Sequence, residues 1–138
     1  MAVGGAAGAL ARFGVSALWP NGTDAHLMWQ QGAAAFPWTT LVINVGGCFC
    51  MGALVSSSRN WPAAPPWFSA FLGTGVLGGF TTFSTYTDDT RRLFENDQPW
   101  SAVGYLLLTP AAAMAGVVLG WICAAVLRRR PPGRNETR

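Results

Sequence analysis

The residues best suited to chemistry lie in one run, Gly73 to Tyr86, where glycines precede a series of hydroxyl side chains inside an apolar stretch. A helix that breaks inside a lipid bilayer exposes backbone N–H and C=O groups, which are tolerated only where they face protein or a water-filled path. The adjacent glycines Gly78 and Gly79 predict such a break. Because the groups freed at a break can bind ions, the run predicts an ion pathway.

Polar side chains in the other apolar segments indicate the charge of that ion. Arg12 and Asn44 each lie within an apolar segment, where such a group is tolerated only if it faces a cavity, water or a partner. For Asn44, a purely structural hydrogen bond between helices is the alternative. No acidic residue lies in the middle of an apolar segment, whereas hydroxyl donors are supplied by Thr81, Thr82, Ser84, Thr85, Thr87, Tyr105 and Thr109. A pathway that offers hydrogen-bond donors and has no acidic side chain favours an anion over a cation.

Aromatic residues in the run could contribute to the same chemistry. Phe80, Phe83 and Tyr86 recur at three-residue spacing, which places them along one face of a helix. Packing in the core is the ordinary interpretation of such a face. However, the edge of an aromatic ring is positive, so rings presented edge-on can solvate an anion without a formal charge. Weak solvation of this kind suits conduction, because the ion must also be released.

The composition indicates that these residues lie in a membrane protein. Charged residues make up 11% of the 138 residues and apolar residues 51%, against about 25% charged in soluble domains. At about 20 residues per crossing, residues 1–128 have room for four transmembrane helices in a single domain. The nine basic residues are all arginines. Several lie in the tail at 129–138, which is predicted to be a disordered cytoplasmic anchor rather than a nucleic-acid site.

Four helices are expected from about 2 to 19, 38 to 58, 67 to 94 and 100 to 127. Turn signals at Pro20-Asn-Gly22 and around Pro62 to Pro66 separate the first three. Three pairs of glycines four residues apart predict that helices approach each other closely, and these pairs are Gly4/Gly8, Gly75/Gly79 and Gly116/Gly120. The elements thus predict an all-α membrane protein whose third helix is broken near Gly78-Gly79.

Enzymatic and cofactor sites are not predicted. Gly73-x-Gly75-x-x-Gly78 formally matches a dinucleotide-binding fingerprint, but no strand precedes it and no βαβ unit surrounds it. The chain has a single histidine, His26, so it offers no set of nucleophile, base and orienting group. Its cysteines, which are interpreted as packing residues, lie in apolar segments at Cys48, Cys50 and Cys123. We therefore expect a protein that is not an enzyme.

Three segments of the chain together resemble the CrcB/Fluc family of fluoride channels. They are Gly4-Gly-Ala-Ala-Gly-Ala-Leu-Ala-Arg-Phe13, Thr39-Thr-Leu-Val-Ile-Asn-Val-Gly-Gly-Cys-Phe-Cys-Met-Gly52 and Gly78-Gly-Phe-Thr-Thr-Phe-Ser-Thr-Tyr86. The resemblance covers nearly the whole chain. It implies a multi-pass subunit of a bacterial inner (plasma) membrane that pairs antiparallel with a second subunit. Each such dimer has two fluoride pores and a central sodium ion, and it exports fluoride passively, which protects the cytoplasm.

The resemblance also implies roles for particular residues. Asn44 is similar to the pore asparagine, and Phe83 to the first phenylalanine of the pair that contacts fluoride. Tyr86 stands where the second is usually phenylalanine, so Tyr86→Phe is expected to stay active. The remaining pore hydroxyls and the vestibule cation are expected at Thr85, Tyr105, Thr109 and Arg12.

A second part of the resemblance concerns the helix break and the fourth helix. The backbone carbonyls of Gly78 and Thr81 are expected to hold the structural sodium ion, with a simple hinge as the alternative. On the fourth helix, Tyr105 and Thr109 belong to a polar track, but Ala113 lacks the hydroxyl often found one turn later. The track is therefore expected to be interrupted in this chain.

Two other functions remain open from the sequence. A small proton-coupled multidrug exporter would need a carboxylate embedded in the membrane, and Asp88 and Asp89 lie only toward the end of the third segment. A non-conducting structural subunit of a channel dimer is the other alternative. Fluoride export therefore remains the favoured function.

The arginines near the membrane bear on the partner. Four crossings place Arg59 and the arginines at 128–130 on one side, and Arg91 and Arg92 on the other. Because arginine bias in short loops sets orientation, the chain should insert mainly with both termini in the cytoplasm. An antiparallel dimer also needs the opposite orientation. We therefore expect a heterodimer with a paralogous subunit of reversed bias, with a dual-topology homodimer as the alternative.

Overall fold

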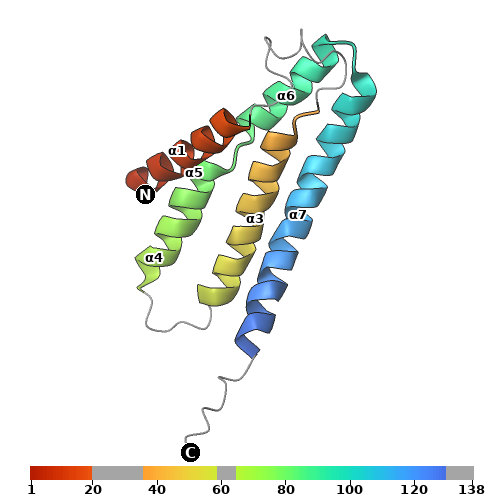
Figure 1. Cartoon of the computed structure of the whole chain (residues 1–138). Helices are drawn as coiled ribbons and strands as arrows, with labels where there is room; N and C mark the ends of the chain where they lie inside the picture. Colours follow the sequence, from red (N-terminus) through yellow and green to blue (C-terminus); the bar gives the residue numbers. More distant parts are fainter. Residues whose placement is uncertain (20–35, 59–64, 130–138) are drawn as a thin grey trace, which may run out of the picture.

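The structure is a computed structural model that describes residues 1–19, 36–58 and 65–129, and these residues are almost entirely helical (Figure 1). The turns predicted near residues 20–22 and 62–64, together with His26, Arg59 and the tail beyond 129, lie outside the described residues. The elements are α1 (Ala2–Leu18), α3 (Trp38–Ser58), α4 (Pro66–Ala70), η2 (Phe71–Leu77), α5 (Gly78–Phe80), α6 (Ser84–Glu95) and α7 (Pro99–Arg129).

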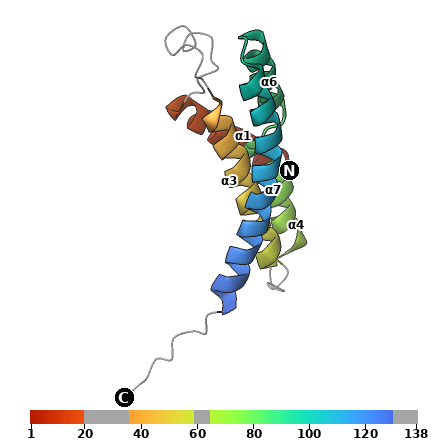
Figure 2. The ribbon, with the colours of Figure 1, turned by 90° about the vertical axis from the view of Figure 1, so that its right-hand side faces the viewer.

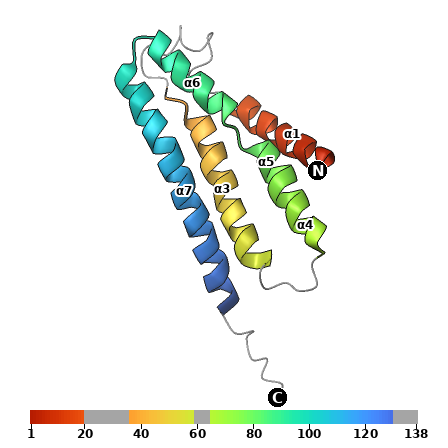
Figure 3. The same cartoon turned by 180° about the vertical axis from the view of Figure 1, so that it is seen from behind.

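These elements form four helical segments in the described part of the chain, because α4, η2, α5 and α6 follow one another as a single broken segment. The long helices α3 and α7 run in the same direction side by side, and the broken segment runs back the opposite way (Figures 1 and 3). Helix α1 lies obliquely across η2 and α5, as the turned view also shows (Figure 2). The all-helical prediction is confirmed.

The lengths and surfaces of the helices fit a membrane environment. Among the described helices, α3 and α7 are both long and apolar enough to cross a bilayer, with mean hydropathies of 1.6 and 2.0. Much of the apolar surface of α7 is exposed, including Leu107, Met114 and Val118. In water such a surface would be unfavourable, whereas lipid or a second subunit can cover it.

Close packing between helices depends on glycine, as the paired spacing predicts. A Cβ atom on Gly8 of α1 would lie 2.0 Å from the carbonyl oxygen of Val76. A Cβ on Gly120 of α7 would likewise lie 2.0 Å from the carbonyl oxygen of Phe49 in α3. Real Cβ contacts are never this short, so even alanine at these positions would force the helices apart. The predicted close contacts are confirmed, and they lie within one chain.

The break in the third segment lies later than the predicted position. Gly78 is helical, with φ −66° and ψ −31°, and the helix continues through Gly79 to Phe80. The chain leaves the helix at Thr81, which is extended with φ −73° and ψ 155°. Gly79 is needed for another reason, because a Cβ there would lie 2.3 Å from the carbonyl oxygen of Gly5. Gly79 therefore leaves the space that α1 occupies, whereas a Cβ on Gly78 would meet only the carbonyl oxygen of Gly73 at 3.7 Å. The break follows both glycines.

Candidate functional site

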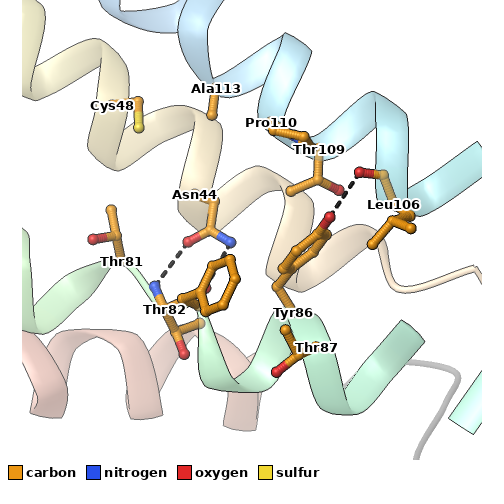
Figure 4. Close-up of a pocket in the computed structure, with 11 residues that line it drawn as sticks. Asn44, Cys48, Thr81, Thr82, Tyr86, Thr87, Leu106, Thr109, Pro110 and Ala113 are labelled. Atoms are coloured by element: carbon orange, nitrogen blue, oxygen red, sulfur yellow. Dashed lines mark hydrogen bonds between the residues drawn. The ribbon is translucent and has the colours of Figure 1, made fainter. Parts of the chain in front are cut away.

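Asn44 of α3 clamps the backbone of the break from the side. Its Nδ2 donates a hydrogen bond to the carbonyl oxygen of Thr82 at 2.9 Å, and its Oδ1 accepts one from the Thr82 N–H at 2.8 Å (Figure 4). Both residues are buried. A buried side-chain amide that bonds both the backbone N–H and the C=O of one residue satisfies polar groups exposed where the helix stops. The interhelical hydrogen bond proposed as the alternative for Asn44 is thus present.

This clamp frees carbonyl groups around the break. In an uninterrupted α-helix the N–H of Thr82 would bond to the carbonyl of Gly78, but it is bonded to Asn44 instead. Similarly, the helical partner of the Thr81 carbonyl would be the N–H of Thr85. That N–H is bonded to the hydroxyl of Thr82, at 3.1 Å. The two carbonyls predicted to bind sodium are therefore among the carbonyls that lose their helical donors at the break.

A cavity of about 420 Å³ lies beside the clamp (Figure 4). It is lined by Asn44 and Cys48 of α3, by Thr81, Thr82, Phe83, Tyr86 and Thr87 from the break and α6, and by Leu106, Thr109, Pro110 and Ala113 of α7. Neither an acidic nor a basic side chain is among these lining residues. The cavity can therefore surround an ion with amide, hydroxyl and aromatic groups but with no formal charge.

The cavity brings some of the predicted pore residues together and leaves others outside. Asn44, Phe83, Tyr86 and Thr109 all line it, although they come from three separate elements. Thr85, Tyr105 and Arg12 are not among the lining residues. Thr85 instead accepts a hydrogen bond from the Thr82 hydroxyl at 3.0 Å. Arg12 is partly buried on α1, and its expected position in a vestibule stays a prediction.

The aromatic residues do not share one face as the sequence spacing suggested. The backbone between Phe80 and Phe83 is not helical, so a three-residue repeat does not align their side chains. The ring of Phe80 lies beside Gly47 of α3. Phe83 and Tyr86 remain neighbours at the cavity, with ring centroids 5.6 Å apart at 49°. Their exposure differs greatly, since Phe83 is 76% exposed and Tyr86 only 7%.

The polar track on α7 contains hydroxyls with unfilled hydrogen-bonding capacity. Tyr105 and Thr109 are one turn apart and both are buried. Within the described part of the chain, neither hydroxyl oxygen makes a hydrogen bond of good geometry, although the hydroxyls of Thr40 and Thr109 lie near that of Tyr105. Buried polar groups in native structures are normally paired, so an unpaired hydroxyl points to water or an ion. Ala113, the next residue on this face, also lines the cavity and supplies no hydroxyl.

The sequence analysis did not separate the two aspartates of α6. Asp88 is on the surface, where it pairs with Arg91 and Arg92 at 2.8 and 2.9 Å. Asp89 is buried and accepts a hydrogen bond from the Thr40 hydroxyl of α3 at 2.7 Å. The spacing in the sequence could have separated them, because Asp89 lies three residues after Tyr86 and four before Leu93, on the helical face that the structure shows to be buried.

Another contact missed by the sequence analysis joins α6 to α7. The hydroxyl of Tyr86 donates a hydrogen bond to the carbonyl oxygen of Leu106 at 2.7 Å (Figure 4). Tyr86 also packs against Tyr105, with ring centroids 5.4 Å apart. The hydroxyl that distinguishes this residue from phenylalanine is therefore engaged with the backbone of the neighbouring helix.

The sequence of the chain is similar to the sequences of known proteins. The family model described as "CrcB-like protein, Camphor Resistance (CrcB)" matches residues 1–121. The chain is 40% identical to the fluoride-specific ion channel FluC 1 of Streptomyces coelicolor over 129 residues. The aligned residues cover 94% of this chain and 75% of that protein. It is 42% identical over 120 residues to FluC 2 of Nocardia farcinica, covering 87% and 79% of the two chains. A third similar protein is FluC of Desulfotalea psychrophila, at 38% over 121 residues, with 88% and 86% covered.

Proposed function

The chain belongs to the CrcB-like protein family, and we propose that it forms a fluoride-selective channel that lets fluoride leave the cytoplasm passively and so reduces fluoride toxicity. The protein is an ion channel rather than an enzyme. The observation that carries this proposal is the uncharged cavity, in which the Asn44 amide, hydroxyl groups and aromatic rings meet beside a broken helix.

Each group of this cavity can replace part of the water around a fluoride ion. The Asn44 side-chain nitrogen has two N–H groups, and one of them is bonded to the Thr82 carbonyl. The second can donate to an anion. The Thr109 hydroxyl offers another donor, and the rings of Phe83 and Tyr86 offer positive edges. Because none of these groups is charged, the anion can bind and still be released, as conduction requires.

Fluoride efflux from liposomes tests this function directly. The purified protein is reconstituted into vesicles loaded with potassium fluoride, and external fluoride is followed with an electrode after a potassium ionophore is added. We expect fast efflux without a proton gradient, and no comparable efflux of chloride. Efflux that requires a proton gradient would instead favour the proton-coupled exporter. Absence of efflux from correctly assembled protein would favour the non-conducting subunit.

We also propose a structural sodium ion at the break, held by the carbonyl oxygens of Gly78 and Thr81. Support comes from the hydrogen bonds around the break, because the helical donors of both carbonyls are bonded elsewhere. Carbonyl oxygens freed in this way can replace the hydration shell of a cation. The same carbonyls from a second subunit would complete the coordination.

Replacing sodium should weaken the assembled channel. When sodium is exchanged throughout for N-methyl-D-glucamine, which is too large for a carbonyl site, we expect a lower melting temperature of the dimer in detergent and less fluoride efflux. Restoring sodium should reverse both effects. A control exchange of chloride for gluconate at constant sodium should change neither. Identical stability and flux in the two cations would exclude the sodium assignment.

The proposed partner is a second subunit in antiparallel orientation in the bacterial inner membrane. Phe83 supports this arrangement, because its ring lines the cavity and is nevertheless 76% exposed in the single chain. A facing subunit would cover this ring and complete the wall of the pathway. The names of two relatives, FluC 1 and FluC 2, are consistent with organisms that carry two such proteins. We therefore favour a paralogous partner over a second copy of this chain.

The distribution of arginine supports one preferred orientation. Arg128 at the end of α7 donates hydrogen bonds to the backbone carbonyl and the hydroxyl of Ser56, near the end of α3. Arg91 and Arg92 lie on α6, at the opposite end of the bundle (Figure 3). We expect reporter enzymes fused to either terminus to be active mainly in the cytoplasm when the chain is expressed without a paralogue. Equal populations in both orientations, with fluoride flux from the single purified chain, would instead establish a homodimer.

A further inference from the structure

A proline inside α7 removes one of the helix's own hydrogen bonds next to the cavity. Pro110 lies within the helix and has no backbone N–H. In the regular α-helical pattern that N–H would bond to the carbonyl four residues earlier, which is the carbonyl of Leu106. A carbonyl left unpaired away from water destabilises the fold, so this one requires another donor.

The missing donor is supplied from a different segment. The Tyr86 hydroxyl of α6 donates to the Leu106 carbonyl oxygen at 2.7 Å, the usual length of an O–H···O hydrogen bond. Figure 4 shows the tyrosine ring reaching from α6 toward α7, where Leu106 and Pro110 both line the cavity. The phenol thus occupies the place that a backbone N–H would take in a helix without proline.

This contact fixes a ring that lines the proposed pathway. A phenylalanine at this position would be held by packing alone, whereas the hydroxyl also determines the direction in which the Tyr86 ring points. Tyr86 packs on Phe83 at one side and on Tyr105 at the other, with centroid distances of 5.6 and 5.4 Å. Because the hydroxyl proton is donated to a carbonyl, the Tyr86 ring lines the cavity without offering it a free O–H donor.

We propose that Tyr86 and Pro110 form one positioning unit, in which the Tyr86 hydroxyl replaces the N–H that Pro110 lacks and thereby sets the orientation of the pore-lining ring. The departure from phenylalanine at position 86 and the proline at position 110 are then a single feature of this chain. The effect on flux rests on the proposed fluoride channel. The hydrogen bond itself does not depend on that function.

A double-mutant cycle tests the unit, with Tyr86→Phe, Pro110→Ala and the combination of both as variants. Flux is measured by fluoride efflux from liposomes, and stability by thermal unfolding of the same purified channel. We expect Tyr86→Phe to stay active, as the resemblance implies, but to conduct about 3- to 10-fold more slowly and to melt at a lower temperature, because the Leu106 carbonyl loses its donor. In the double variant the alanine restores a backbone N–H. Its flux should therefore return to within about twofold of Pro110→Ala alone.

Two results would overturn the proposal. One is additivity, in which the Tyr86→Phe change has the same effect with proline or alanine at position 110. The other is a change in stability without any change in flux, since this would reduce the contact to a structural role. Tyr105→Phe provides the matched control, because in the described residues the Leu106 carbonyl accepts from Tyr86 and not from the Tyr105 hydroxyl, so this change should not couple to Pro110→Ala.

The cycle also separates this proposal from the proposed function. If the unchanged protein gave no fluoride flux, the channel function would fail while the stability arm could still be evaluated. Coupling in thermal unfolding between positions 86 and 110 would then support the hydrogen-bond replacement. If thermal unfolding showed no coupling between these two positions, the proposed pairing of Tyr86 with Pro110 would be overturned, whether or not the protein conducts fluoride.

Discussion

Asn44→Asp is expected to lower fluoride flux at least 100-fold while the chain still assembles. One carboxylate oxygen can still accept the Thr82 N–H, but the other would face the Thr82 carbonyl, to which the Asn44 Nδ2 now donates. The substitution therefore replaces a donor by a negative charge at the wall of the cavity. Two like charges 4 Å apart repel by about 4 kcal/mol at an effective dielectric constant near 20, which corresponds to a factor of roughly 1,000 in the population of the bound anion.

Fluoride efflux from liposomes measures this effect, and gel filtration with thermal unfolding checks assembly. Asn96→Asp is the matched control. Asn96 is exposed at the end of α6, where its side chain donates to the Arg92 carbonyl and does not line the cavity. The same chemical change there should leave flux within about twofold of the unchanged protein, because exposed charges are screened by salt. Normal flux in a folded Asn44→Asp channel would remove Asn44 from the pathway.

Phe83→Ile is expected to reduce fluoride flux at least 10-fold with little change in the stability of the single subunit. Isoleucine has a similar bulk but no positive ring edge, so it cannot solvate an anion in the way an aromatic ring does. The Phe83 ring is 76% exposed in the chain, and its removal should leave the subunit's own core almost unaffected. A loss of flux would then reflect the pathway rather than the fold.

The control for this substitution is Phe94→Ile on the same helix. Phe94 is also exposed, at 48%, but it is not among the cavity-lining residues. We expect its replacement to leave flux within about twofold of the unchanged protein. Measuring the dimer fraction of both variants separates conduction from assembly, because Phe83 also faces the proposed partner. Equal flux in Phe83→Ile and Phe94→Ile would reduce the aromatic contact to packing.

The sequence by itself determined the environment and the main elements of this protein. Low charge and long apolar segments predict membrane helices, and α3 and α7 are long and apolar enough to cross a bilayer. Glycines spaced four apart predict close helix contacts, which occur at Gly8 and Gly120. These properties follow from side-chain size and polarity along one segment, so a local pattern is sufficient to predict them. The polar residue in an apolar helix, Asn44, likewise indicated a buried partner.

The tertiary structure alone decided the details of the site. The break falls at Thr81 because Asn44, 38 residues before Thr82, takes the N–H that would have continued the helix. The Tyr86 hydroxyl finds its acceptor 20 residues away in Leu106. In each case a side chain from one segment satisfies a backbone group in another. Spacing along the chain cannot specify such pairs, because they depend on how the helices are placed against each other once close packing has fixed their distance and rotation.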